Sequence, residues 1–270
     1  MDVIFLKQRI IYGALCALVT VLCIVLSPYS RVLFFVAASL IAGHEMKNAF
    51  GKCGFRIQTW PMYMLCIFCS GLLVIEKTGY VFPVFMMIML ALFTQMILFS
   101  RPSVRDVYAT LGVMAYPLSP ILLMVYISLR EEIWAAVFLN GILPAIISDT
   151  FALFGGRKFG RHKLSPHISP KKTVEGLICG LIMGTLSGFA VHYILIGFGR
   201  SIIPLWAVLI ASLLGAVAGA FGDLAASSVK REAGIKDYSN LIPGHGGIMD
   251  RVDSALFAIP TCYMIYALFV

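Results

Sequence analysis

Residues 222–253 read GDLAASSVKREAGIKDYSNLIPGHGGIMDRVD and lie between two long apolar runs. This stretch carries four aspartates and four basic residues, together with one glutamate and one histidine. So much charge at the edge of apolar segments is costly in lipid and points to a functional surface. We therefore expect one membrane helix to end within the stretch and another to begin at its close.

The spacing within this stretch places several polar groups together. If the preceding helix continues through Ser227, then Asp223, Ser227 and Lys230 share one helical face. The turn at 243–247, Pro-Gly-His-Gly-Gly, cannot be helical, but its glycines let backbone N–H groups approach a bulky anion. The stretch therefore favours binding of a phosphate-bearing molecule.

Two further acids follow the turn. Asp250 and Asp253 are three residues apart and are expected to share a face at the start of the last helix. Carboxylates on two helices, with bases and glycines between them, suit a divalent cation that bridges phosphate oxygens. The expected metal ligands are Asp223 and Asp250, with Asp253 as a third.

The whole chain has the composition of a membrane protein. Of its 270 residues 60% are hydrophobic and 13% are charged, and its mean hydropathy is +0.93; soluble domains carry about 25% charged residues. We predict an all-α polytopic membrane protein with about nine transmembrane helices, the first of them retained rather than cleaved as a signal peptide. The apolar segments are 9–27, 31–46, 59–75, 81–99, 107–128, 133–154, 174–198, 203–226 and 252–270.

The basic residues indicate an orientation. With a cytoplasmic N-terminus, most of the 21 Lys and Arg residues fall in segments that face the cytoplasm. The net charge of +8 thus reflects topology and gives no reason to expect nucleic acid as a partner. We expect one membrane domain over 1–270, in which 1–130 are mainly packing helices and 131–270 are the catalytic half.

Polar residues elsewhere are sparse. Asp149 lies inside an apolar segment, where an acid is a functional candidate by default. The basic segment 157–176, RKFGRHKLSPHISPKKTVEG, is interpreted as a rigid cationic surface for phosphate, although a purely topological role is the alternative. Glu45, in His44-Glu45-Met46-Lys47, is interpreted as part of an interfacial cluster that reaches water, in preference to a supporting role at the site.

Glycines recur every four residues in one apolar segment and line part of the next. Such small residues let helix backbones approach closely in lipid. Close approach of these two helices is expected to bring Asp223 toward the basic segment. The glycines are Gly176, Gly180, Gly184 and Gly188, followed by Gly215, Gly219 and Gly222.

Two blocks of residues in fixed order resemble the phosphatidate cytidylyltransferases, the CDP-diacylglycerol synthases. The first block contains Asp149-Thr150, Phe154-Gly155, Phe159-Gly160, Lys163-Leu164 and the run Ile168–Gly176; the second contains Ser227-x-Val229-Lys230-Arg231, Lys236-Asp237 and Ile242–Asp253. The chain departs from the family pattern at Phe151, His167, Ala226 and Tyr238.

The resemblance implies the reaction CTP + phosphatidate → CDP-diacylglycerol + pyrophosphate. It also implies Mg²⁺, with a second cation such as K⁺ nearby, and an active site on the cytoplasmic side of the cell inner (plasma) membrane; a homodimer is left open. Asp223, Lys230, Arg231, Asp250 and Arg251 are the expected catalytic residues. Substrate contacts are expected from Asp149, Lys171, Lys172, Ser227, Lys236, His245, Gly246 and Gly247.

Three other functions remain open at the level of sequence. A transporter also uses intramembrane acids, and would move substrate across vesicles without CTP turnover. A lipid-binding membrane protein would use the basic segments alone and would tolerate loss of Asp250. The nearest alternative is a CTP-using enzyme that acts on another lipid, such as a polyprenol kinase or an archaeal-type lipid cytidylyltransferase.

Overall fold

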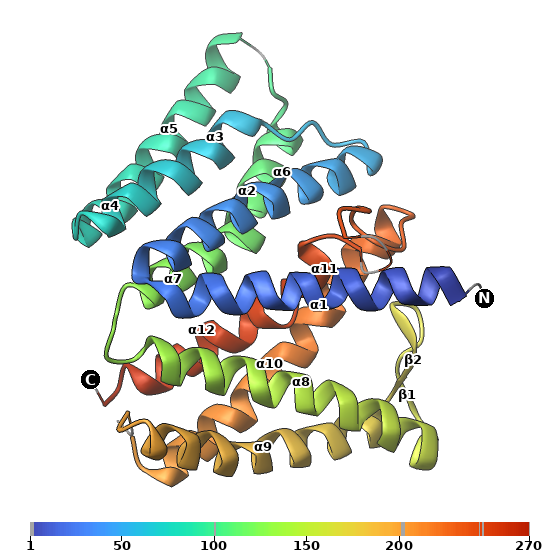
Figure 1. Ribbon diagram of the computed structural model, residues 1–270. Helices are drawn as coiled ribbons and strands as arrows, with labels where there is room; N and C mark the ends of the chain where they lie inside the picture. The colour runs from blue at the N-terminus through green and yellow to red at the C-terminus, as the bar shows by residue number, and fades with distance from the viewer. Residues whose placement is uncertain (1–2, 100, 201–202, 243, 245, 270) are drawn as a thin grey trace. The chain divides into compact units, whose positions relative to one another are not determined.

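The computed structural model describes residues 3–99, 101–200, 203–242, 244 and 246–269, which form two compact units. Unit 1 comprises Met1–Leu129 and Val229–Arg251, and unit 2 comprises Arg130–Ser228 and Val252–Val270. Both are built mainly from helices (Figure 1). Residues 229–251, from the polar stretch, therefore belong to the same unit as the N-terminal half of the chain.

Helices of unit 1 begin at residues that cap them. The Ser27 hydroxyl accepts a hydrogen bond from the Ser30 backbone N–H, and Pro28 occupies the first turn of α2. Ser103 caps α6 in the same way, through the N–H of Asp106. The elements are α1 Val3–Leu26, α2 Pro28–Lys52, α3 Thr59–Met64, η1 Leu65–Cys69, α4 Ser70–Val74, η2 Thr78–Tyr80, α5 Val81–Phe99, α6 Val104–Val113, η3 Met114–Leu118, α7 Ser119–Ser128 and α11 Met249–Val252 as far as Arg251.

Unit 2 is organised around two long adjacent helices. Figure 1 shows α8 and α9 side by side, with a β-hairpin at one end of the pair. Strands β1 and β2 of this hairpin are antiparallel, and Lys163 pairs with Thr173. The elements are α8 Trp134–Phe159, β1 Lys163–Ser165, β2 Ser169–Thr173, α9 Val174–Gly197, α10 Leu205–Glu232 as far as Ser228, and α12 Ala255–Tyr266.

The glycines of α9 pack largely against α8. A Cβ added at Gly180 would lie 2.6 Å from the Ser148 carbonyl oxygen, and one at Gly176 would lie 2.6 Å from the Ala152 carbonyl oxygen. Only further along does the row of glycines meet α10, where a Cβ on Gly188 would lie 2.5 Å from the Ser212 hydroxyl. Close packing is thus confirmed, but the expected partner of the first two glycines was wrong.

Replacing Gly180 by Leu is expected to destabilise the protein by about 1–3 kcal/mol, because the new side chain must push α8 and α9 apart. Thermal unfolding in detergent measures this loss. Gly197 in the same helix is the matched control, since a Cβ there would meet no described atom within 4 Å. Equal melting temperatures for Gly180→Leu and Gly197→Leu would contradict the packing role of Gly180.

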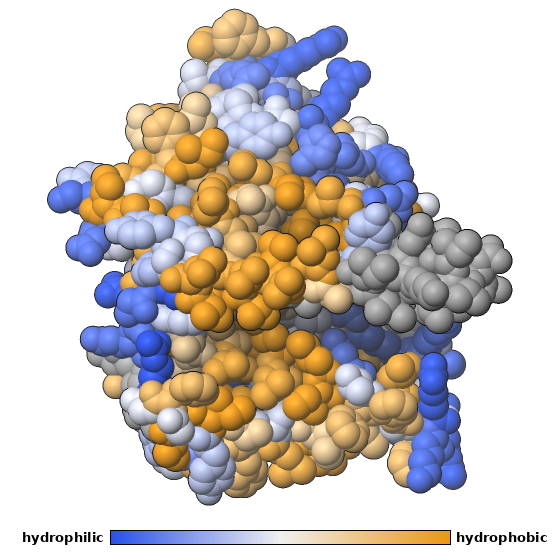
Figure 2. Space-filling model, viewed as in Figure 1, coloured by the Kyte–Doolittle hydropathy of each residue, from blue (hydrophilic) through white to orange (hydrophobic). Residues whose placement is uncertain are grey.

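Five helical stretches in the described part of the chain are long and apolar enough to cross a membrane, judged by length and composition. They are Thr78–Phe99, Val104–Ser128, Trp134–Phe159, Val174–Gly197 and Leu205–Glu232. Figure 2 shows large hydrophobic areas over the visible face, with hydrophilic side chains gathered toward its edges. These features are typical of a membrane protein, in which apolar side chains face lipid.

The structure tests three expectations about local structure. The all-α prediction is correct for most of the chain, but the basic segment forms the β1–β2 hairpin. The preceding helix does continue through Ser227, because α10 ends at Glu232. Asp250 and Asp253 do not start one continuous helix: Asp250 lies in the four-residue α11, and Asp253 lies in a turn before α12.

Candidate active site

A cavity of about 720 Å³ in unit 2 gathers several of the predicted residues. Both Asp149 of α8 and Asp223 of α10 line it. Four basic residues line it as well: Arg157, Lys163, Lys171 and Lys172. The charged lining is therefore net positive, which suits a molecule with several phosphate groups. Asp149 is exposed in the structure, so a molecule in the cavity can reach its carboxyl group.

The lining of this cavity is also apolar in part. Leu153, Leu164 and Leu177 contribute to its wall, as do Ala152 and Ala220. Three of the helices that surround it are candidate membrane spans. A cavity that combines basic and apolar side chains fits an amphiphile, whose phosphate and acyl chains need both environments.

Asp223 forms an ion pair with Lys172 inside this cavity. The Lys172 Nζ and Asp223 Oδ2 atoms are 2.5 Å apart, and the two side chains are 28% and 27% exposed. The Ser227 hydroxyl donates to Asp223 Oδ1 over 3.4 Å. Partly exposed ion pairs contribute only about 0–1 kcal/mol to stability. Separating the two side chains therefore costs little, so that Asp223 can bind a cation and Lys172 can bind a phosphate.

The hairpin that carries Lys171 and Lys172 is held by side chains at the start of α9. Thr173 caps α9 by accepting a hydrogen bond from the Gly176 N–H over 3.1 Å. The Glu175 carboxylate accepts hydrogen bonds from the backbone N–H groups of Arg161 and His162, over 3.0 and 3.2 Å. The lysines are thus presented on backbone that is fixed at both ends.

In unit 1, Asp250 is the centre of the segment that follows α10. Its Oδ1 atom accepts from Lys230 Nζ over 2.8 Å, and its Oδ2 atom accepts from the Tyr238 and Gly247 N–H groups over 2.8 and 3.0 Å. The Asp250 side chain is only 4% exposed. A carboxylate has about four acceptor positions, so these three bonds leave room for one further ligand.

Glu45 corrects the interpretation of the N-terminal half. It is 2% exposed, and so it is not an interfacial group that reaches water. Its carboxylate accepts hydrogen bonds from the Ser239 hydroxyl over 2.6 Å and from the Ile248 and Met249 N–H groups over 3.1 and 2.7 Å. The segment 239–249 is therefore anchored to α2. Nothing in the sequence around Glu45 indicates this contact with a segment about 200 residues away.

Glycines in this segment make room for the two carboxylates. A Cβ on Gly246 would lie 2.7 Å from Asp250 Oδ2, and one on Gly247 would collide with the Glu45 carboxylate. Gly246 also has φ +83°, a conformation that favours glycine. The glycines of the turn are therefore needed for close packing, and the approach of its N–H groups to an anion stays a prediction.

Other predicted residues occupy different settings. Arg231, Lys236 and Arg251 are exposed. Asp253 is in unit 2, and its carbonyl oxygen would lie 2.5 Å from a Cβ on Gly222, the residue before Asp223. His245 lies outside the described residues. Among those described, no three His, Cys, Asp or Glu side chains cluster in a way that could hold a metal ion.

The fold and these two polar clusters define a mainly helical membrane protein with a cationic, partly apolar cavity. The chain belongs to the Cytidylyltransferase family, whose sequence model matches residues 7–269. It is 30% identical to the phosphatidate cytidylyltransferase of Aquifex aeolicus (strain VF5), over 97% of this chain and 91% of that protein.

Two staphylococcal relatives match a shorter stretch. The chain is 44% identical to the phosphatidate cytidylyltransferase of Staphylococcus saprophyticus and 40% identical to that of Staphylococcus haemolyticus, each over 122 residues. In both cases the matched part covers 45% of this chain and 45% of the relative. The match thus spans about half the length of these two relatives.

Proposed function

We propose that this chain is a phosphatidate cytidylyltransferase, which transfers the cytidylyl group of CTP to phosphatidate and releases CDP-diacylglycerol and pyrophosphate. The observation that carries the proposal is the unit 2 cavity, in which Asp223 and Lys172 are paired within a wall that is partly basic and partly apolar. The phosphate of a lipid can contact the bases while its acyl chains follow the apolar wall. Family membership and the names of the relatives support the same reaction.

The reaction requires placement and neutralisation of charge more than proton transfer. An ionised phosphate oxygen of phosphatidate attacks the α-phosphorus of CTP, and the bond from that phosphorus to the oxygen bridging to the β-phosphorus breaks. Pyrophosphate then leaves with the bonding electron pair. Because the nucleophile is already ionised, no general base is needed. Lys171 and Lys172 hold phosphate oxygens in line for this displacement.

We propose that Asp223 and Asp250 are the protein ligands of a Mg²⁺ ion, with Asp253 as a third ligand and K⁺ as a second cation. Mg²⁺ usually takes one or two carboxylates, keeps several waters and completes its shell with substrate phosphates, so a cluster of three acids is not required. The partly exposed Asp223 carboxylate fits this mode. A bound Mg²⁺ would neutralise charge that develops on the phosphates. Lys230, Arg231, Lys236, Arg251 and His245 remain proposed phosphate contacts.

Purified protein in detergent with CTP, phosphatidate and Mg²⁺ is expected to release pyrophosphate steadily. Diacylglycerol in place of phosphatidate is the matched control, since it has the same acyl chains but no phosphate nucleophile. Conversion of CTP to CDP with a polyprenol, without release of pyrophosphate, would instead identify a polyprenol kinase. Failure to turn over CTP with any lipid, combined with solute movement across vesicles, would instead favour a transporter.

We also propose nine membrane spans within a single membrane domain, an inner-membrane location and a cytoplasmic active site. In this arrangement α9 and α10 each cross once, so the hairpin before α9 and the segment after α10 reach the same side. The clustering of basic residues in both places supports the cytoplasmic side. Measurement of the molecular mass in detergent would show whether the protein forms a homodimer.

In a chain without its native cysteines, His167→Cys and Asn240→Cys are expected to resist a membrane-impermeant thiol reagent in intact cells and to react after permeabilisation. Both residues are exposed, so lack of reaction would reflect sidedness. Lys77→Cys, in the turn before α5, is the control that should react from outside. Labelling of both His167→Cys and Asn240→Cys in intact cells would reverse the proposed orientation.

A further inference from the structure

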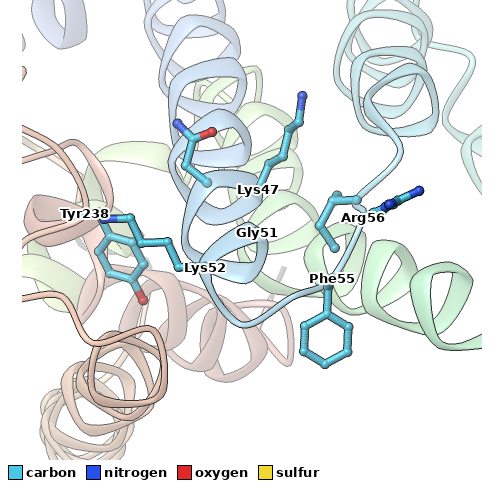
Figure 3. Close-up of a pocket in the computed structure, with 8 residues that line it drawn as sticks. Lys47, Gly51, Lys52, Phe55, Arg56 and Tyr238 are labelled. Carbon is cyan, nitrogen blue, oxygen red and sulfur yellow. The ribbon is translucent and has the colours of Figure 1, made fainter.

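A second cavity, of about 690 Å³, lies within unit 1 at the end of α2. Its charged lining residues are Lys47 and Lys52 of α2 and Arg56 of the following loop. Figure 3 shows these three side chains together with Phe55 and with Tyr238, which comes from the segment after α10. The reaction proposed above uses none of the three basic residues.

Little negative charge faces the three basic residues in the part of the chain that is described. None of them forms an ion pair there, and no described Asp or Glu lines the cavity. Asp106 is nearby, but it accepts a hydrogen bond from the backbone N–H of Arg56, over 2.7 Å. This bond fixes the loop, and the Asp106 carboxylate also interacts electrostatically with Arg56. Because Asp106 does not line the cavity, the charged lining itself is entirely basic.

The end of α2 works against an anion here, since a helix C-terminus carries about half a negative charge. Three full positive charges exceed that value, so the lining of the cavity stays net positive. Basic residues whose only role is to set the membrane topology would not need to line a cavity. Here they surround one that has buried Ile57 and Tyr238 in its wall. Phe55 is also fixed, because the Arg105 guanidinium carbon lies 4.1 Å from its ring centre.

We propose that this cavity is a binding site for a phosphate-bearing anion. The phosphate group would contact Lys47, Lys52 and Arg56, and the rest of the molecule would pack against Phe55 and Ile57. Its source is either the headgroup of an anionic phospholipid or a soluble polyphosphate.

Tyr238 connects this site to the segment after α10. Its N–H group donates to Asp250 Oδ2, and the Lys230 Nζ atom lies 5.5 Å from its ring centre. A ligand against Tyr238 would therefore stabilise the position of residues 238–250. Binding itself does not depend on the proposed reaction, and the test below is run without CTP.

The test measures how fast an amine-acylating reagent modifies individual lysines, by mass spectrometry of the purified protein. Ion pairing with phosphate holds a lysine in its charged, unreactive form, so bound anion should slow modification of Lys47 and Lys52 about tenfold. Lys77 of the same unit is the internal control and should not change. One arm adds inorganic pyrophosphate; the other compares nanodiscs that contain phosphatidylglycerol with nanodiscs of phosphatidylcholine alone.

Gly51→Leu is the matched variant, because a Cβ on Gly51 would meet no described atom within 4 Å and its side chain would enter the cavity. It should fold normally and lose the protection of Lys47 and Lys52. Arg56→Gln should reduce the protection about threefold or more, as expected for loss of one of three charged contacts. Protection by pyrophosphate alone would identify a soluble ligand, and protection by phosphatidylglycerol alone a lipid. Absence of protection in both arms, or its persistence in Gly51→Leu, would overturn the proposal.

Discussion

Asp223→Asn and Asp250→Asn are each expected to reduce CTP-dependent pyrophosphate release by about 100-fold or more, the scale of losing one preorganised electrostatic group. Each substitution keeps the size of the side chain and removes one negative charge from the proposed cation site. Release of pyrophosphate over a range of Mg²⁺ concentrations measures the effect. Partial rescue at high Mg²⁺ would indicate weakened metal affinity, and lack of rescue would indicate altered geometry.

The two variants should differ in stability. Asp223 is partly exposed and forms one weak ion pair, so Asp223→Asn should melt near the wild-type temperature. Asp250 accepts three hydrogen bonds and is nearly buried. The amide NH₂ group of an asparagine there would face N–H donors and could not accept their hydrogen bonds. The Asp250→Asn variant should therefore also unfold at a lower temperature. Glu232→Gln, an exposed change on α10, is the control for both. Full CTP turnover in both aspartate variants would show the metal assignment to be wrong.

Glu45→Ala is expected to lower the free energy of unfolding by about 2–4 kcal/mol and turnover by about tenfold or more, because buried N–H donors lose their acceptor. The affected donors are the N–H groups of Ile248 and Met249. Glu45→Gln should have a smaller effect, since it keeps one acceptor oxygen. Chemical unfolding and steady-state kinetics measure the two losses.

Limited trypsin cleavage after the exposed Lys236 separates a local effect from general instability. At a temperature where each variant is folded, Glu45→Ala should be cut faster than His44→Ala, which changes an exposed neighbour on the same helix. Equal cleavage rates would mean that Glu45 does not hold the segment in place.

Residue order in the sequence located most of the charged groups that the structure gathers. The motif singles out Lys171 and Lys172, and helical spacing singles out Asp223; all three line one cavity. Helix positions also followed from hydropathy, since an apolar run of about 20 residues has few other options in lipid. Each of the nine predicted apolar segments contains helix in the described part of the chain.

What the sequence missed depends on contacts between distant residues. Glu45 and Ile248 are 203 positions apart, and no local pattern indicates that one holds the other. The β1–β2 hairpin is too short for its residue pattern to indicate strands. The Glu175 carboxylate accepts hydrogen bonds from the backbone N–H groups of residues 161 and 162 beside it. The row of glycines in α9 indicated close packing but could not identify the neighbouring helix.

The contact between Gly247 and Glu45 also restricts how the protein can evolve. Every single-nucleotide missense change of a glycine codon adds at least a Cβ, and a Cβ on Gly247 would occupy the space of the Glu45 carboxylate. Alanine would fit at position 247 only after a shorter acidic residue had replaced Glu45. These two positions should therefore show sign epistasis: Glu45→Asp, harmful in the present background, should become beneficial when residue 247 is alanine.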